Sequence, residues 1–124
     1  MSHLLSIAVG GALGALARYG IGISLADKWV KGFPVPTLLI NISGAFLLGL
    51  VNTLFQERFP VPPPVRLGIG VGFLGAYTTF STFSFEIISL FESGRVGEGV
   101  LYAVLSLVLG LIGVVIGIGV GKLF

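Results

Sequence analysis

The fold is decided by the stretch Gly75-Ala76-Tyr77-Thr78-Thr79-Phe80-Ser81-Thr82-Phe83-Ser84, which interrupts an apolar run from about residue 67 to residue 91. The run is long enough to cross a membrane, yet its centre carries five serine and threonine hydroxyls and two phenylalanines in place of aliphatic side chains. Irregular backbone in hydrocarbon survives only beside protein or a polar cavity, because its polar groups need partners. The stretch therefore predicts a break near the bilayer midplane and, at the break, a binding site or a conduction path.

The composition is that of an integral membrane protein. Of the 124 residues, 55% are hydrophobic and 10% are charged, whereas soluble domains average about 25% charged residues. So few charges do not cover a water-facing surface. The seven basic residues are dispersed singly, which speaks against nucleic acid as a partner. The chain has no cysteine, so thiol chemistry and disulfides are excluded.

Four segments are apolar over the roughly 20 residues that a spanning helix needs. They cover about residues 4–25, 36–55, 67–91 and 100–124, and the short connections between them hold the prolines and most of the charges. We therefore predict an all-α membrane protein, a single domain over residues 1–124 with four transmembrane helices, the third of them broken. Because no extramembrane domain remains, its activity is expected within the bilayer.

The loop charges give no preferred orientation. If the spans alternate, each side of the membrane carries three basic loop or terminal residues: Arg58, Arg66 and Lys122 against Lys28, Lys31 and Arg95. The positive-inside rule then has no bias to act on. Two interpretations stay open, namely a weak signal overridden by other factors, or dual topology with pairing as an antiparallel homodimer.

Small residues recur at helical spacing in these segments, as in Gly10/Gly14, Gly68/Gly72 and Gly113/Gly117/Gly121. In lipid such spacing lets helix backbones approach and pack. Some of these positions serve packing within one protomer. The chain nevertheless has more such faces than one four-helix bundle needs, which favours a homo-oligomer.

Polar side chains inside the predicted spans are candidates for the site. Arg18 either faces the protein interior or water, or extends its head to the membrane surface. Asn41 and Asn52, with Thr37 on the same side, form either a polar stripe or a simple staple between helices. Glu86 is the only acidic residue well inside a span, and is either functional or an ion-pair partner of Arg18.

The third and fourth segments extend this polar set. If the helix resumes after an interruption at Gly75–Thr79, Thr79, Thr82 and Phe83 lie on the same side as Glu86, with Phe80 bordering them. Tyr102 and Ser106 share a face of the fourth segment, although a tyrosine near a helix start is often only interfacial. Hydroxyls, amides, one arginine and the positive edges of aromatic rings solvate anions, while carbonyls freed by a break suit a hard cation.

Two enzyme-like patterns carry no enzymatic function. Gly70 to Gly75 matches Gly-x-Gly-x-x-Gly, but the motif lies in an apolar spanning segment without the βαβ context that nucleotide binding requires. The single histidine, His3, has no acid partner suited to a catalytic triad. We therefore predict neither nucleotide binding nor catalysis.

The motifs together resemble the Fluc (CrcB) family of fluoride channels. The resemblance rests on Gly10-Gly11 with Gly14-Ala15 and Arg18-Tyr19, on Asn41, and on the Thr-Thr-Phe-Ser-Thr-Phe string of residues 78–83. It covers the whole chain in length, span number and motif order, and the string in a broken third span is its most specific part.

The resemblance implies a dual-topology antiparallel homodimer with two fluoride pores, a multi-pass protein of the inner (plasma) membrane that lets fluoride leave the cytoplasm passively. It implies that Phe80 and Phe83 present ring edges to the pore and that Asn41 adds amide contacts. The polar path would continue through Ser81, Thr82, Glu86, Tyr102 and Ser106. Arg18 would set the electrostatics of a vestibule, and the backbone carbonyls of Gly75 and Thr78 would hold a central structural sodium ion.

Two other classes of membrane protein share some of these features. Small dual-topology multidrug or cation exporters have a similar size, but they depend on an acidic residue in the first span, and residues 4–25 contain neither aspartate nor glutamate. A structural subunit of a larger membrane complex would explain the glycines but not the Thr/Ser/Phe string.

Overall fold

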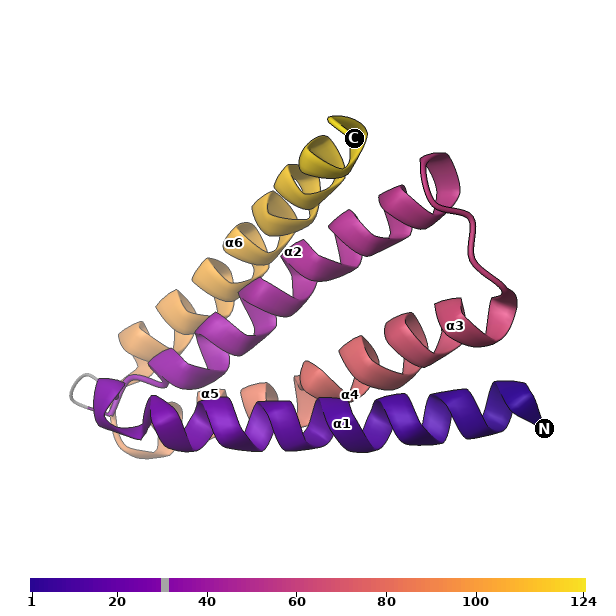
Figure 1. The fold of residues 1–124 in the computed structure, drawn as a ribbon. Helices are drawn as coiled ribbons and strands as arrows, with labels where there is room; N and C mark the ends of the chain where they lie inside the picture. Colours follow the sequence, from indigo (N-terminus) through magenta and orange to yellow (C-terminus); the bar gives the residue numbers. More distant parts are fainter. Residues whose placement is uncertain (30–31) are drawn as a thin grey trace.

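The computed structural model describes residues 1–29 and 32–124, and the described residues form helices without any strand. Lys31, one of the basic residues in the loop tally, lies outside the described residues. The order along the chain (Figure 1) is α1 (Ser2–Ser24), the 3₁₀ turn η1 (Ala26–Lys28), α2 (Val35–Glu57), α3 (Pro63–Leu67), the π-helical η2 (Gly68–Leu74), α4 (Gly75–Tyr77), α5 (Phe80–Glu92) and α6 (Val96–Lys122). The predicted all-α class is therefore confirmed.

Within the described ranges, three helices are long and apolar enough to cross a membrane, namely α1, α2 and α6. They correspond to the segments predicted at about 4–25, 36–55 and 100–124. Pro36 occupies the first turn of α2, where a missing backbone N–H leaves no helical hydrogen bond unmade. α6 begins four residues earlier than predicted, at Val96 rather than at residue 100.

The segment predicted at 67–91 runs through α3, η2, α4 and α5, and its helix is broken only at Thr78 and Thr79. Both residues are extended, with φ/ψ of −83°/158° at Thr78 and −146°/121° at Thr79. Gly75 remains helical, at φ −63° and ψ −37°. The break is thus shorter than the interruption from Gly75 to Thr79 that the sequence suggests. The glycines before it produce a wide π-helical turn and no loss of helix.

Side-chain hydroxyls stabilise the break, because threonine side chains compete for backbone partners at helix ends. The Thr78 Oγ1 donates to the Leu74 carbonyl at 3.0 Å. The Thr79 Oγ1 accepts from the Thr82 N–H at 3.2 Å and so caps the start of α5. The hydroxyl-rich string therefore ends one helix and begins the next.

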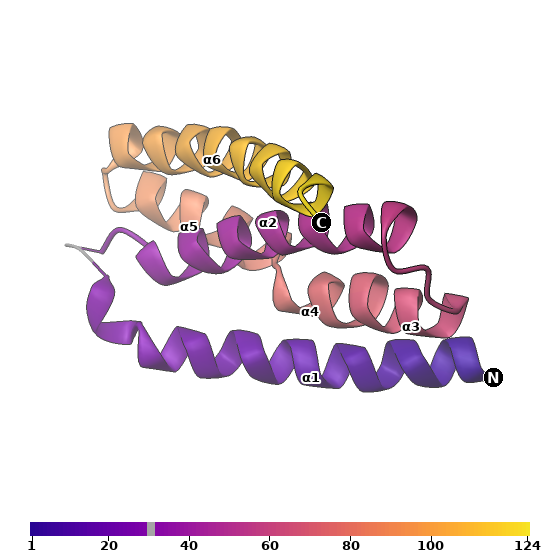
Figure 2. The ribbon, with the colours of Figure 1, turned by 45° about the horizontal axis from the view of Figure 1, so that its top comes forward.

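The helices pack as two sets that diverge from one end of the bundle (Figure 1), with α2 along α6 and α1 along η2 and α4. In Figure 2, α1 and α6 lie on opposite sides, with α2 and the broken segment between them. Glycines make both contacts close. A Cβ on Gly49 would lie 2.5 Å from the Val114 carbonyl oxygen, and a Cβ on Gly72 would lie 2.8 Å from the Ile7 carbonyl oxygen. Backbones therefore touch where the sequence places small residues.

Gly14 gives a testable case of this packing. A Cβ there would overlap the Phe73 carbonyl group, which cannot move without displacing η2. We expect Gly14→Ala to lower stability by about 1–3 kcal/mol and to reduce the temperature at which detergent-solubilised protein loses its Trp29 fluorescence signal. Gly20→Ala is the matched control, since a Cβ at Gly20 meets no atom within 4 Å. Equal melting of the two variants would contradict this packing.

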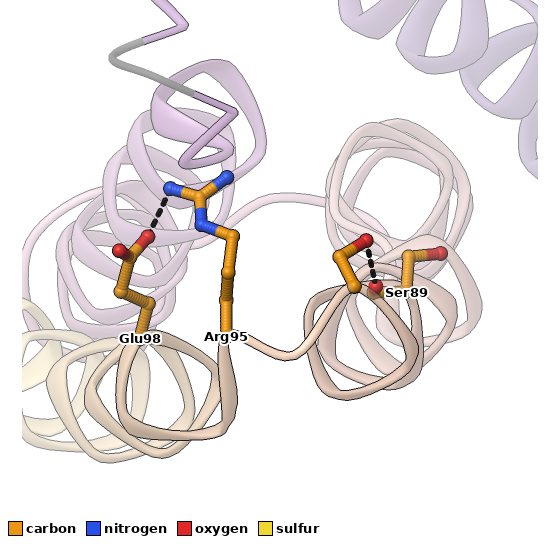
Figure 3. Close-up of polar contacts among 4 residues, drawn as sticks. Ser89, Arg95 and Glu98 are labelled. Atoms are coloured by element: carbon orange, nitrogen blue, oxygen red, sulfur yellow. Dashed lines mark hydrogen bonds and ion pairs between the residues drawn. The ribbon is translucent and has the colours of Figure 1, made fainter.

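The turn between α5 and α6 fixes these helices side by side. Gly94 has a positive φ of 77°, which glycine adopts without strain. On either side of it, Ser93 Oγ donates to the Ser89 carbonyl at 2.8 Å, and Arg95 forms an ion pair with Glu98 (Figure 3). The turn brings α5 against the first half of α6, where the Tyr102 hydroxyl donates to Glu86.

Candidate functional site

Asn41 clamps the chain at the break. Its Nδ2 donates to the Thr79 carbonyl at 3.0 Å, and its Oδ1 accepts from the Thr79 N–H at 2.8 Å. One side chain of α2 thereby pairs both backbone groups of the extended Thr79. Hydrocarbon would otherwise leave these two groups without hydrogen bonds. The amide therefore has a structural partner, and its second N–H remains for another acceptor.

Glu86 accepts two hydroxyl hydrogen bonds. Thr37 Oγ1 donates to its Oε2 at 2.9 Å, and the Tyr102 hydroxyl donates to its Oε1 at 2.7 Å. Tyr102 is fully buried, at 0% exposure, so it is not an interfacial tyrosine. Arg18 forms its hydrogen bond with the Ala76 carbonyl instead, at 3.1 Å. The ion pair between Arg18 and Glu86, one of the two readings open from the sequence, is absent from the described residues.

Three aromatic rings form a line that leads to this carboxylate. Phe80 and Phe83 have ring centroids 6.0 Å apart and tilted by 57°, and Phe83 meets Tyr102 edge-on at 5.1 Å and 69°. Phe80 is 79% exposed, whereas Phe83 is half-buried. The line therefore runs from the surface of the protomer at Phe80 inward to the Tyr102 hydroxyl and Glu86.

A groove of about 630 Å³, here called the central groove, opens beside the break. It lies between α2, the broken segment and α6, and its wall includes Asn41, Gly70, Gly75, Thr78, Thr79, Phe80, Phe83, Ser106 and Gly110. Most of the wall is apolar. The Ser106 Oγ is buried and has no hydrogen-bond partner among the described residues. A buried hydroxyl without a partner is unusual in a folded protein.

A second groove, of about 470 Å³, lies on the other side of Thr79 and is called the Arg18 groove. Arg18, Thr37, Thr79 and Thr82 line it, together with Tyr19 and Trp29 near the end of α1. Thr79 borders both grooves. The two grooves therefore meet at the break, and a hydrogen bond links Thr37 of the Arg18 groove to the carboxylate of Glu86.

The structure brings together most of the residues that the sequence singles out. Six of them, Asn41, Gly75, Thr78, Phe80, Phe83 and Ser106, line the central groove. Arg18 and Thr82 line the other groove, and Glu86 and Tyr102 are hydrogen-bonded behind the aromatic line. Ser81 is exposed and lines neither groove. Asn52, the second asparagine of the predicted stripe, is exposed and lies apart from both grooves.

The sequence places Thr37 and Thr79 beside the candidate residues but gives neither of them a role in the site. Thr37 donates to Glu86, and Thr79 is the residue that Asn41 clamps. The signal for Thr37 is its position one helical turn before Asn41. No local signal marks Thr79 as the clamped residue, because its partner is 38 positions away in the sequence.

The arrangement suits a small anion better than a reaction. It offers hydroxyl and amide donors, ring edges with positive partial charge, and one guanidinium, in an apolar surrounding. Such donors replace the hydration shell of an anion without the strong binding of a fully charged site.

Comparison with known proteins agrees with this reading. The family model described as "CrcB-like protein, Camphor Resistance (CrcB)" matches residues 5–118. The chain is similar to proteins named "Fluoride-specific ion channel FluC" from Acidobacterium capsulatum, at 45% identity over 94% of this chain and 93% of the relative. It is also similar to those of Chloroflexus aurantiacus (44% identity; 100% and 98%) and Synechocystis sp. (48%; 91% and 87%). With the family model and full-length relatives in agreement, the chain belongs to the CrcB family.

Proposed function

We propose that this protein is a passive fluoride channel that works as an antiparallel homodimer with two pores. The observation that carries the proposal is the aromatic line at the break: two phenylalanine rings lead from an open groove to a buried set of hydroxyls. The relatives named as fluoride-specific channels extend over nearly the whole chain, so they include this segment.

The proposed topology has four spans in one domain. α1, α2 and α6 each cross the membrane, and α3 to α5 together form the third crossing, with Thr78 and Thr79 near its middle. This third crossing includes η2 and is held on two sides by α1 and α2. Its broken backbone therefore keeps hydrogen-bond partners. We place the protein in the inner (plasma) membrane, where an exit path for cytoplasmic fluoride is needed.

The central groove supports pairing with a second copy. Asn41, Thr78 and Ser106 face it, and lipid chains offer such groups no hydrogen bonds. Gly70 and Gly110 also line it, although a Cβ on either meets no atom within 4 Å in the protomer. Their small size is not required by packing inside one chain, but it lets another helix approach closely. The balanced loop charges fit an inverted partner.

Fluoride would reach the break through the Arg18 groove, where the guanidinium attracts anions. It would then exchange water for the ring edges of Phe80 and Phe83 and for donors from Asn41, Ser81 and Thr82. The Thr37 and Tyr102 hydroxyls now point to Glu86, and an arriving anion would compete with the carboxylate for these two donors. Ser106, whose hydroxyl has no partner in the described chain, would serve the same path.

A structural sodium ion fits the carbonyls of Gly75 and Thr78. Both residues line the central groove, and among the described residues no side chain or loop amide donates to either carbonyl. Two carbonyls are too few to coordinate a hard cation, so the same pair from the second copy would complete the set. A sodium ion bound there would offset the repulsion between the partial negative charges of carbonyl oxygens that meet at the dimer centre.

Passive conduction suffices for export. Fluoride enters from acidic surroundings as neutral HF, dissociates in the cytoplasm, and is trapped as the anion. The membrane potential then drives the anion outward through any selective leak, at about 2.3 kcal/mol per charge for each 100 mV.

Efflux from liposomes tests the proposal. Purified protein is reconstituted in vesicles loaded with potassium fluoride, and a fluoride electrode follows release after valinomycin is added in sodium-containing buffer. We expect rapid fluoride release that depends on valinomycin. We expect no comparable release of chloride from chloride-loaded vesicles, followed with a chloride electrode. Release no faster than from protein-free vesicles would rule out the channel, and release without valinomycin would show coupling to another ion.

A further inference from the structure

Arg18 binds a backbone carbonyl at the break. Its Nε donates to the Ala76 carbonyl at 3.1 Å, in the last turn before the chain becomes extended at Thr78. The Leu74 carbonyl, two residues earlier, still accepts the Thr78 N–H at 3.1 Å. A helix that stops leaves its last carbonyls without amide donors. The guanidinium takes the place of such a donor at Ala76.

The packing of α1 explains why Arg18 reaches this carbonyl. Gly10, Gly14 and Arg18 follow one another at intervals of four residues on one face of α1. A Cβ on Gly10 would overlap the Gly68 carbonyl, and a Cβ on Gly14 would overlap the Phe73 carbonyl. The two glycines thus bring α1 into backbone contact with η2, and the next position on the face meets the end of α4.

No carboxylate competes for the guanidinium in the described part of the chain. The ion pair found there joins Arg95 and Glu98, and Glu86 accepts from hydroxyls. The side chain is part-buried, and Arg18 is among the residues that line the Arg18 groove. The same residue therefore has two separable properties, a donor at Nε and a charge.

We propose that Arg18 is a positioning residue, which fixes the backbone before the break through its Nε donor independently of its charge. With Asn41 holding Thr79 on the far side, the two side chains anchor both ends of the extended segment. A chain held at both ends presents Phe80 and Phe83 in one orientation. This inference rests on the proposed channel function only for its flux readout.

Three substitutions separate the donor from the charge. In Arg18→Gln the side-chain Nε2 takes the place of the arginine Nε, so the donor remains and the charge is lost. Arg18→Met puts a methyl group there and loses both. Arg18→Lys keeps the charge but has a methylene at that place. Flux is measured in liposomes at 1 M salt, where the Debye length is about 3 Å and a distant charge is screened.

If Arg18 positions the break, Arg18→Gln keeps fluoride flux within about twofold of wild type, while Arg18→Met loses roughly tenfold, because the Ala76 carbonyl is left without its donor. Arg18→Lys falls below Arg18→Gln. A role through charge alone gives equal flux in the three variants at 1 M salt, and at low ionic strength it gives lysine near wild type with glutamine as low as methionine. Either result would overturn the inference.

Hydrogen exchange of the peptide that contains Thr78 and Thr79 gives a readout independent of transport. We expect faster exchange at these amides in Arg18→Met, and wild-type exchange in Arg18→Gln. If the methionine variant does not fold, the lysine and glutamine variants are compared instead, by fluoride flux and by hydrogen exchange. An inactive wild type would reject the channel function and leave the exchange comparison valid. Equal hydrogen exchange in the glutamine and lysine variants would reject the positioning role of Arg18 and leave the proposed channel function unaffected.

Discussion

Replacing both Phe80 and Phe83 by isoleucine is expected to reduce fluoride efflux about a hundredfold, and each single replacement about tenfold. Isoleucine keeps much of the apolar bulk but removes the ring edge, whose positive partial charge is the group proposed to contact the anion. A rise of about 1.4 kcal/mol in the barrier lowers the rate tenfold. Initial efflux from liposomes with a fluoride electrode measures the effect.

Phe85→Ile is the matched control for this experiment. Phe85 belongs to the same helix and is 72% exposed, close to the 79% of Phe80, but it does not line the central groove. We expect wild-type efflux from this variant. If Phe80→Ile and Phe83→Ile conduct as well as the control, the ring edges do not contact the anion.

The second large effect is expected at Asn41. Asn41→Ala leaves the N–H and the carbonyl of Thr79 without their partner. An unsatisfied buried group costs about 1–3 kcal/mol, so we expect the loss of two such bonds to abolish measurable efflux and to lower the melting temperature. Asn41→Asp keeps the acceptor and loses the donor, and should retain more of its melting temperature than the alanine variant. Efflux and thermal unfolding in detergent measure the two consequences.

Asn52 supplies the control for Asn41, because it has the same side chain on the same helix but is exposed and away from the break. Asn52→Ala should melt and conduct like wild type. Normal efflux from Asn41→Ala would show that the extended segment holds its shape without the clamp, and that the clamp is not part of the channel's function.

The sequence predicts the long helices well, because twenty or so apolar residues leave few alternatives in a membrane. α2 spans Val35–Glu57 where 36–55 is predicted. The Thr/Ser/Phe string also locates the break to within a few residues. The local conformation of the glycines before it is not predictable in this way, since Gly75 suits a helix, a π-helical turn or an irregular bend. The neighbouring α1 decides among them by close packing against η2.

The contacts that build the site come from tertiary packing. Asn41 meets Thr79 across 38 positions, and Thr37 meets Glu86 across 49. No periodicity relates such pairs, so the sequence identifies the polar residues but not their partners. Tyr102 illustrates the same limit. Because α6 begins at Val96, the tyrosine lies nearly two turns inside the helix, where Phe33 and Phe83 enclose it.

Electrical recording in a planar bilayer tests the account most directly. A tenfold fluoride gradient across a membrane that contains the purified protein, with chloride balancing the anions, sets a fluoride equilibrium potential of about 59 mV. The account predicts a steady current that reverses near this potential and keeps its reversal when protons or potassium are varied. A current that reverses at the chloride, potassium or proton potential, or no current from protein that is folded and reconstituted, would contradict it.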